Sequence, residues 1–203
     1  MDSSTQNTKD LAIIIEKRKI LFQFSLMVVA AVIGGFYFAK VIGASTSPNI
    51  RDKILEHFTY AYPSDYDFSD LLCGIIKSCM PYFILTVTVF VFSFSYVNYI
   101  VSDLILAIIG FITGFSIAIV AAFSYKIGML SMILFAISMI TSLLVMLYFT
   151  FSAALFSLEI RTRATNGRII LNPRKLLLII VKMLAVLGTF VIFTFVRCLT
   201  LLF

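Results

Sequence analysis

The residues of this chain best suited to chemistry are its single histidine and its three cysteines. His57 stands beside Glu56, and the chain has no HExxH pair that could bind zinc. It also lacks a CxxC pair, a GxSxG nucleophile motif and a glycine-rich phosphate loop. We therefore predict a non-enzymatic protein with no catalytic residue, no metal site and no cofactor.

The cysteines are expected to pack as small apolar residues. Cys73 and Cys79 belong to one apolar segment, at a spacing that points them to different faces of a helix. Cys198 lies near the end of the last apolar segment. A disulfide from Cys198 to either of the others remains an open alternative.

Five apolar segments fill most of the 203-residue chain, and they contain the three cysteines. Each exceeds the roughly 20 apolar residues that cross a hydrocarbon core of about 30 Å. Their continuous runs of Leu, Ile, Phe, Val and Ala exclude a barrel of alternating strands. We predict an all-α, polytopic integral membrane protein with a membrane domain over residues 20–203. Its spans cover 20–44, 71–96, 104–123, 130–158 and 176–202.

Residues 1–19 precede this domain as an N-terminal segment. Residues 1–10 are polar and are expected to be disordered, whereas Leu11 to Lys19 extend the first helix along the interface. The first apolar run is longer than the 7 to 15 residues typical of a signal-peptide core. It is therefore predicted to be a retained first span.

Basic residues flank the spans in a pattern that predicts orientation. One cluster precedes the first span and another lies in the loop 159–175, so four crossings separate them and both face one side, expected to be the cytoplasm. The residues are Lys17, Arg18, Lys19, Arg161, Arg163, Arg168, Arg174 and Lys175. The net charge of +6 is thus explained by topology in a cell membrane rather than by nucleic-acid binding.

The loop 45–70 is then the main element outside the membrane. Its first part has the spacing of a short amphipathic helix, and its second part interleaves tyrosines with aspartates. The favoured interpretation is an aromatic belt at the headgroups, and the alternative is a docking surface for an outside partner. The candidate docking residues are Ile54, Phe58, Tyr60, Tyr62, Tyr66 and Phe68.

Small residues within the spans predict close helix contacts. Ala31, Gly35 and Ala39 recur every four residues in the first span, and Gly110 and Gly114 form a GxxxG in the third. We expect packing within one chain to use these faces rather than a dimer, although an oligomer remains open.

Polar residues in the spans carry further expectations. Pro81 removes the hydrogen bond to the carbonyl of Lys77, which predicts a bend in the second span. The hydroxyl side chains of the fourth span are expected to bond to their own backbone or to a neighbouring helix. They are Ser138, Thr141, Ser142, Thr150 and Ser152.

Four basic residues lie inside or close to the spans. Lys77 and Lys182 lie near the starts of their helices, and helical side chains lean toward the N-terminus, so both are expected to reach water. Lys40 and Arg197 lie near the ends of theirs, where the same lean carries the charge toward the membrane. We expect these two to pair with Asp70 or with another subunit.

The order of features resembles the stage II sporulation protein M family. The resemblance includes a basic start, an outer amphipathic helix over Ile50 to Tyr60, and entry to the second span through Phe68-Ser69-Asp70-Leu71-Leu72. It continues with Gly110-Phe111-Ile112-Thr113-Gly114-Phe115, Lys126-Ile127-Gly128-Met129 and Phe151-Ser152-Ala153-Ala154-Leu155. The chain departs from the family in the middle of the fourth span, where residues 135–141 lack the proline-containing break that the family would have.

The resemblance implies a membrane scaffold for peptidoglycan remodelling during endospore engulfment, in the septal and engulfing membrane of the mother cell. The implied partners are a lytic transglycosylase and an amidase or endopeptidase, each membrane-anchored with its catalytic domain outside. The alternative is a transporter subunit, a permease or substrate-binding component, in which the loop Glu159 to Lys175 couples to an ATPase. An enzyme acting on lipids ranks last, because no nucleophile stands beside a base.

Overall fold

Five α-helices make up the part of the chain that the computed structural model describes, which is residues 3–45, 68–95, 97–122, 129–165 and 173–202. They are α1 (Ser3–Ser45), α3 (Phe68–Phe92), α4 (Asn98–Ala122), α6 (Met129–Thr165) and α7 (Pro173–Leu202). Each contains a segment long and apolar enough to cross a membrane. This agrees with the predicted class, a multi-pass helical membrane protein.

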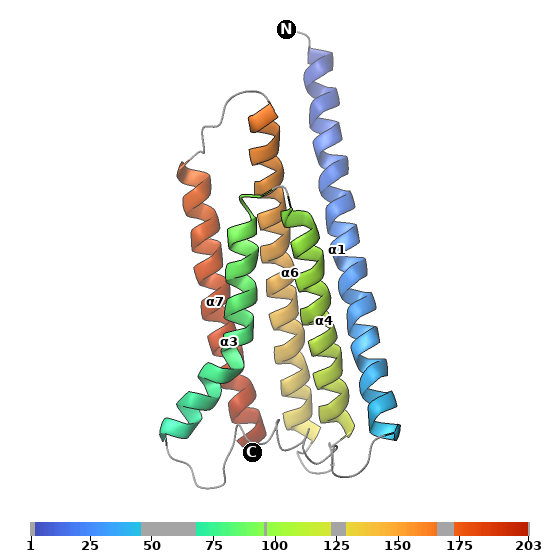
Figure 1. Ribbon diagram of the computed structural model, residues 1–203, viewed down its shortest axis with the longest axis vertical. Helices are drawn as coiled ribbons and strands as arrows, with labels where there is room; N and C mark the ends of the chain where they lie inside the picture. The colour runs from blue at the N-terminus through green and yellow to red at the C-terminus, as the bar shows by residue number, and fades with distance from the viewer. Residues whose placement is uncertain (1–2, 46–67, 96, 123–128, 166–172, 203) are drawn as a thin grey trace.

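Consecutive helices run in opposite directions along the bundle (Figure 1). α1 packs along α4, and α6 contacts both α4 and α7. α3 lies against α7, with smaller contacts to α4 and α6. At its N-terminal end α1 projects beyond the other helices, and the two chain termini lie at opposite ends of the bundle (Figure 1).

Several helix ends differ from the sequence-based predictions. α1 begins at Ser3, so residues 3–10, which were expected to be disordered, belong to the helix. Extending a helix adds one hydrogen bond per residue without the cost of nucleation, and the apolar span supplies the nucleus. The second span was predicted to reach residue 96, but α3 ends at Phe92.

The connection between α3 and α4 is a tight turn, because α4 begins at Asn98 and not at Leu104. The Ser93 hydroxyl donates to the carbonyl of Phe90 at 2.6 Å, and the Ser95 amide donates to the carbonyl of Phe92 at 2.8 Å. The Ser95 hydroxyl accepts from the Val97 amide at 3.3 Å. These bonds satisfy backbone groups that a helix end leaves free. Six residues expected in a loop therefore belong to the third span.

The predicted loop 159–175 is also shorter than expected, since α6 continues to Thr165 and α7 begins at Pro173. Proline suits the first helical position because it has no amide hydrogen to satisfy. An ion pair between Lys175 and Glu159 joins the two helices at this end.

α3 changes direction partway along its length, between its teal and green portions in Figure 1. Pro81 lies inside this helix. Its ring and its missing amide hydrogen give a physical cause for a bend.

The contact between α1 and α4 is close enough to involve the two backbones. A Cβ atom added at Gly35 would lie 2.1 Å from the carbonyl oxygen of Phe111, and one added at Gly114 would lie 2.0 Å from that of Val32. A Cβ at Gly110 would lie 3.0 Å from the Cβ of Ala31. Only a hydrogen fits at Gly35 and Gly114.

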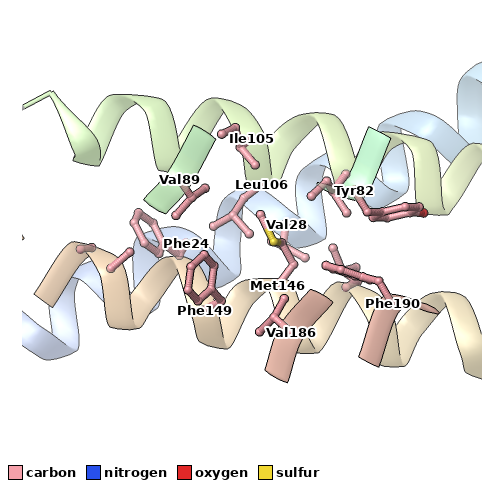
Figure 2. Close-up of a cluster of buried hydrophobic side chains, with 14 of the residues drawn as sticks. Phe24, Val28, Tyr82, Val89, Ile105, Leu106, Met146, Phe149, Val186 and Phe190 are labelled. Carbon is pink, nitrogen blue, oxygen red and sulfur yellow. The ribbon is translucent and has the colours of Figure 1, made fainter. Parts of the chain in front are cut away.

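The centre of the bundle is filled by apolar side chains from all five helices (Figure 2). Phe24 of α1, Leu106 of α4, and Met146 and Phe149 of α6 are fully buried there. Figure 2 shows Tyr82 of α3 close to Phe190 of α7, and their ring centroids are 4.9 Å apart. The outward faces carry large apolar residues, as expected for contact with lipid.

We predict that Gly114→Ala destabilises the protein. The added methyl group must displace the Val32 carbonyl, and overpacking of this kind costs about 1–3 kcal/mol. The free energy of unfolding, measured by circular dichroism during titration of mixed micelles with a denaturing detergent, should fall by that amount.

Gly34→Ala is the matched control, because a Cβ added at Gly34 meets nothing within 4 Å. It should leave the free energy of unfolding unchanged or slightly higher, as alanine favours helix. Equal unfolding curves for the two variants would mean that the close α1–α4 approach is not required.

Candidate functional site

Arg197 of α7 is a buried cation between three helices, with 8% of its surface exposed. Its Nη1 donates to the Tyr82 hydroxyl of α3 at 3.5 Å and approaches the Met139 sulfur of α6 at 3.0 Å. Its Nη2 donates to Ser142 of α6 at 3.4 Å and to Thr194 of its own helix at 3.3 Å. One guanidinium group thus bonds to α3, α6 and α7.

The ring of Tyr82 adds a second contact with this cation. The guanidinium carbon lies 5.3 Å from the ring centroid, within the range of a cation–π interaction. Arginine suits such a place because its planar fork can donate several hydrogen bonds at once while its face stacks on an aromatic ring. The expectation that Arg197 pairs with Asp70 stays a prediction, since the side chain of Asp70 lies outside the described residues.

Lys182 of α7 is a second cation within the span, and it is partly buried. Its ammonium donates to the Ser152 hydroxyl of α6 at 3.1 Å and lies 4.9 Å from the ring centroid of Tyr148. Ser152 and Tyr148 stand about 10 and 16 Å along α6 from Glu159, at 1.5 Å per residue. The α6 hydroxyl and ring are thus described contacts of Lys182, and the expectation that its charge reaches water stays a prediction.

A cluster of polar side chains, Gln23 of α1 with Tyr99 and Asp103 of α4, also joins α1 to α4 near the α3–α4 turn. Gln23 Nε2 donates to Asp103 Oδ2 at 2.6 Å, and the Tyr99 hydroxyl donates to Gln23 Oε1. Beside them, Ser102 donates to Asn98 at 3.2 Å. Within the described part of the chain, Asp103 Oδ1 and Asn98 Nδ2 are buried without a hydrogen-bond partner.

Sequence reasoning missed this group because it began the third span at Leu104 and so left Asp103 outside the membrane helix. A signal was present in the spacing. Tyr99 and Asp103 are four residues apart, as are Asn98 and Ser102, which places each pair on one helical face.

The fourth-span hydroxyls behave as predicted. Ser138 donates to the carbonyl of Phe135, Thr141 to that of Ile137, and Ser142 to that of Ser138. Thr150 donates to the carbonyl of Met146. Ser152 contacts the neighbouring helix through Lys182. Bonding to their own helix satisfies these hydroxyl hydrogens away from water, and the Ser142 oxygen remains able to accept from Arg197.

The remaining predicted site residues divide into three groups. Ala31, Gly35, Gly110 and Gly114 come together between α1 and α4, and Ala39 is buried on the same helix as Gly35. Lys17, Arg18, Lys19, Arg161, Arg174 and Lys175 are exposed. Ile54, Phe58, Tyr60, Tyr62, Tyr66 and Arg168 lie outside the described residues, and for Phe68 and Arg163 only the helical backbone is described.

Cys73 is exposed and Cys79 is buried, and both are free. The side chain of Cys198 lies outside the described residues, so a disulfide from Cys198 stays an open alternative. The Cys79 thiol lies 3.9 Å from the carbonyl oxygen of Phe190. Among the described residues, no three His, Cys, Asp or Glu side chains form a group that could hold a metal ion.

Chemically, the described site residues offer two cations inside the membrane span. Arg197 has its donors directed to groups of α3, α6 and α7, so it fixes helices to one another. Lys182 has an ammonium at the edge of α6 and α7, where an anion could approach from the lipid side. Comparisons of the chain with protein-family profiles, curated protein sequences and solved structures find no match.

We predict that Arg197→Lys destabilises the bundle even though it keeps the charge. Lysine has one ammonium in place of a fork, so it cannot reach Tyr82, Ser142 and Thr194 together. Hydrogen bonds from charged groups contribute about 1.5–3 kcal/mol each, so the free energy of unfolding should fall by at least that amount.

Tyr82→Phe is the control, because it keeps the ring over the guanidinium and removes only the hydroxyl. This variant should lower the free energy of unfolding by about 1 kcal/mol.

A double-mutant cycle between Arg197→Lys and Ser142→Ala then measures the coupling of α7 to α6. Additive effects would show that the contact between these side chains contributes nothing.

Proposed function

We propose that this protein is a non-enzymatic membrane scaffold, which holds membrane-anchored partner proteins against a packed helical bundle. The observation that carries the proposal is the filled centre of the bundle. Phe24, Phe149 and Phe190 come from three different helices, and each is 0% exposed. A permease must open a polar path through such a centre, whereas a scaffold needs only a stable body.

The contacts that hold the five helices together support the same proposal. Backbone contact at Gly35 and Gly114 locks α1 to α4, and Arg197 joins α3, α6 and α7. Because α4 and α6 are also packed together, the two groups form one body. A body whose helices are fixed relative to one another can hold several partners in a defined arrangement.

The outer surface offers room for such partners. Every helix presents large apolar side chains outward, including Phe22 at 71%, Ile100 at 69% and Ile192 at 63% exposure. In a membrane these faces contact lipid or the spans of other proteins. Anchoring helices of partners could pack on them without any change in the core.

The identity of the partners follows from the resemblance to the stage II sporulation protein M family. On that basis we propose membrane-anchored cell-wall hydrolases, a lytic transglycosylase and an amidase or endopeptidase, at the septal and engulfing membrane. Their catalytic domains would stand outside, on the side of the loop 45–70.

This arrangement requires a cytoplasmic N-terminus. Lys17, Arg18 and Lys19 of α1 lie toward the same end of the bundle as Arg161 of α6 and Arg174 and Lys175 of α7 (Figure 1). Lys175 pairs with Glu159 at this end. Positive residues collect on the cytoplasmic side of membrane proteins.

Labelling of intact cells tests the orientation. In a variant whose native cysteines are serine, His57→Cys should react with a membrane-impermeant maleimide, and Ser4→Cys should react only after the membrane is permeabilised. The reverse pattern would mean that the loop 45–70 cannot meet partners outside the cell.

Purification from native cells tests the scaffold itself. The tagged protein, extracted in mild detergent, should retain anchored cell-wall hydrolases, as identified by mass spectrometry. Capture of an ATPase together with permease subunits, with substrate uptake in proteoliposomes, would instead establish the transporter alternative.

A further inference from the structure

We propose that Lys182 is the recognition point for a partner's transmembrane helix that carries an aspartate or glutamate in its middle third. This inference deepens the proposed scaffold function by naming the chemistry of the partner. It starts from the place of the Lys182 ammonium at the junction of α6 and α7, between Ser152 and Tyr148.

The contacts of this ammonium leave its charge without a carboxylate among the described residues. A hydroxyl and an aromatic ring each supply partial negative charge, and neither neutralises a cation. An ionised lysine inside a membrane is costly, and such residues usually pair with an opposite charge or line a functional site. Lys175, by contrast, has Glu159 as its partner.

The position of the Lys182 ammonium along the bundle axis determines which anion can pair with it. The ammonium is level with Ser152, about 10 Å into the bundle from the Lys175–Glu159 pair. Since the hydrocarbon core is about 30 Å thick, a lipid phosphate stays near its boundary. A carboxylate on a spanning helix reaches this level directly, so a partner helix fits better than a lipid headgroup.

The lipid-facing side of α7 next to Lys182 has the shape that such a helix needs. We define the α7 outer face as Leu178, Val181, Ala185, Gly188 and Ile192, which are all exposed. Their spacing of three or four residues places them along one side of the helix. A Cβ added at Gly188 meets nothing within 4 Å, so the backbone there is open on its outer side.

Two independent features thus coincide on one face. Small residues allow a second helix to approach closely, which is the main source of helix association in lipid. The neighbouring ammonium selects helices with an acid at matching depth over purely apolar ones. Tyr148 is 57% exposed and extends the same surface onto α6.

A defined peptide tests the proposal with the full-length protein. The probe is a synthetic Leu/Ala transmembrane helix with one central aspartate, reconstituted with the labelled protein in phosphatidylcholine vesicles. Its association is measured by fluorescence energy transfer, and a peptide with leucine in place of the aspartate gives the reference.

The aspartate peptide should bind about tenfold more tightly than the leucine peptide, as expected for one strong polar contact within a membrane. Lys182→Met should remove this difference, whereas Lys182→Arg should keep most of it. Lys175→Met should leave it unchanged, because that lysine already pairs with Glu159.

Gly188→Leu provides a steric test with its own control. A leucine at position 188 projects into the space that the partner helix would occupy, so binding should fall about tenfold or more while the circular dichroism spectrum stays the same. Gly34→Leu adds the same group on α1, where a Cβ also meets nothing within 4 Å, and should have no effect.

Three results would overturn the inference: equal binding of both peptides, binding unaffected by Lys182→Met, or binding by spin-labelled phosphatidylglycerol at Lys182 in place of the peptide. Co-purification from native cells distinguishes this inference from the proposed scaffold function. If the Lys182→Met protein still co-purifies with the hydrolases that bind the native protein, the inference about Lys182 is wrong and the scaffold proposal is kept. If the peptide binds at Lys182 but no hydrolase is captured, the scaffold fails and the site stands.

Discussion

The contact between α1 and α4 is the constraint on which the arrangement of the other helices rests. In lipid there is little hydrophobic force to bring helices together, so association depends on close packing and on polar contacts. Glycines at positions 35 and 114 let the two backbones touch, which gives the most extensive contact surface in the bundle. α6 then packs against α4, and α7 and α3 complete the bundle on the other side.

Hydrogen bonds between side chains also hold helices together. Arg197 joins α7 to α3 and α6, and Gln23 joins α1 to α4 near the α3–α4 turn. The contacts of Arg197 with Tyr82 and Ser142 are buried, and the alternative for such atoms in hydrocarbon is to remain unsatisfied at a cost of several kcal/mol. Such contacts therefore select one arrangement of helices among the many that similar apolar surfaces would permit.

Much of this architecture could be predicted from the sequence because the membrane limits the choices. Five long apolar runs are sufficient to predict five helices. The presence of Ser and Thr inside the fourth span correctly predicted bonds to their own backbone or to a neighbouring helix. The helix ends were less predictable. Polar residues such as Asn98, Ser102 and Asp103 resemble a loop in a hydropathy profile. In the bundle, Ser102 donates to Asn98 within α4, and Asp103 accepts from Gln23 of α1.

The contact partners of Lys182 could not be predicted for a related reason. Its own helix favours a lean toward the N-terminus, but the hydroxyl and ring that hold it belong to α6. Only the pairing of the two helices reveals them. The contacts of a lysine within a span thus depend on the neighbouring helix as well as on its own.

The length of α1 has a mechanical consequence. Its apolar span begins at Ile15, so about three turns of continuous helix precede it. An unbroken helix transmits rotation and axial displacement along its length, because each turn is hydrogen-bonded to the next. Since the glycine contact clamps this same helix to α4 deep in the bundle, torque applied to the projecting end would be delivered to the centre of the membrane domain instead of being absorbed by a flexible linker.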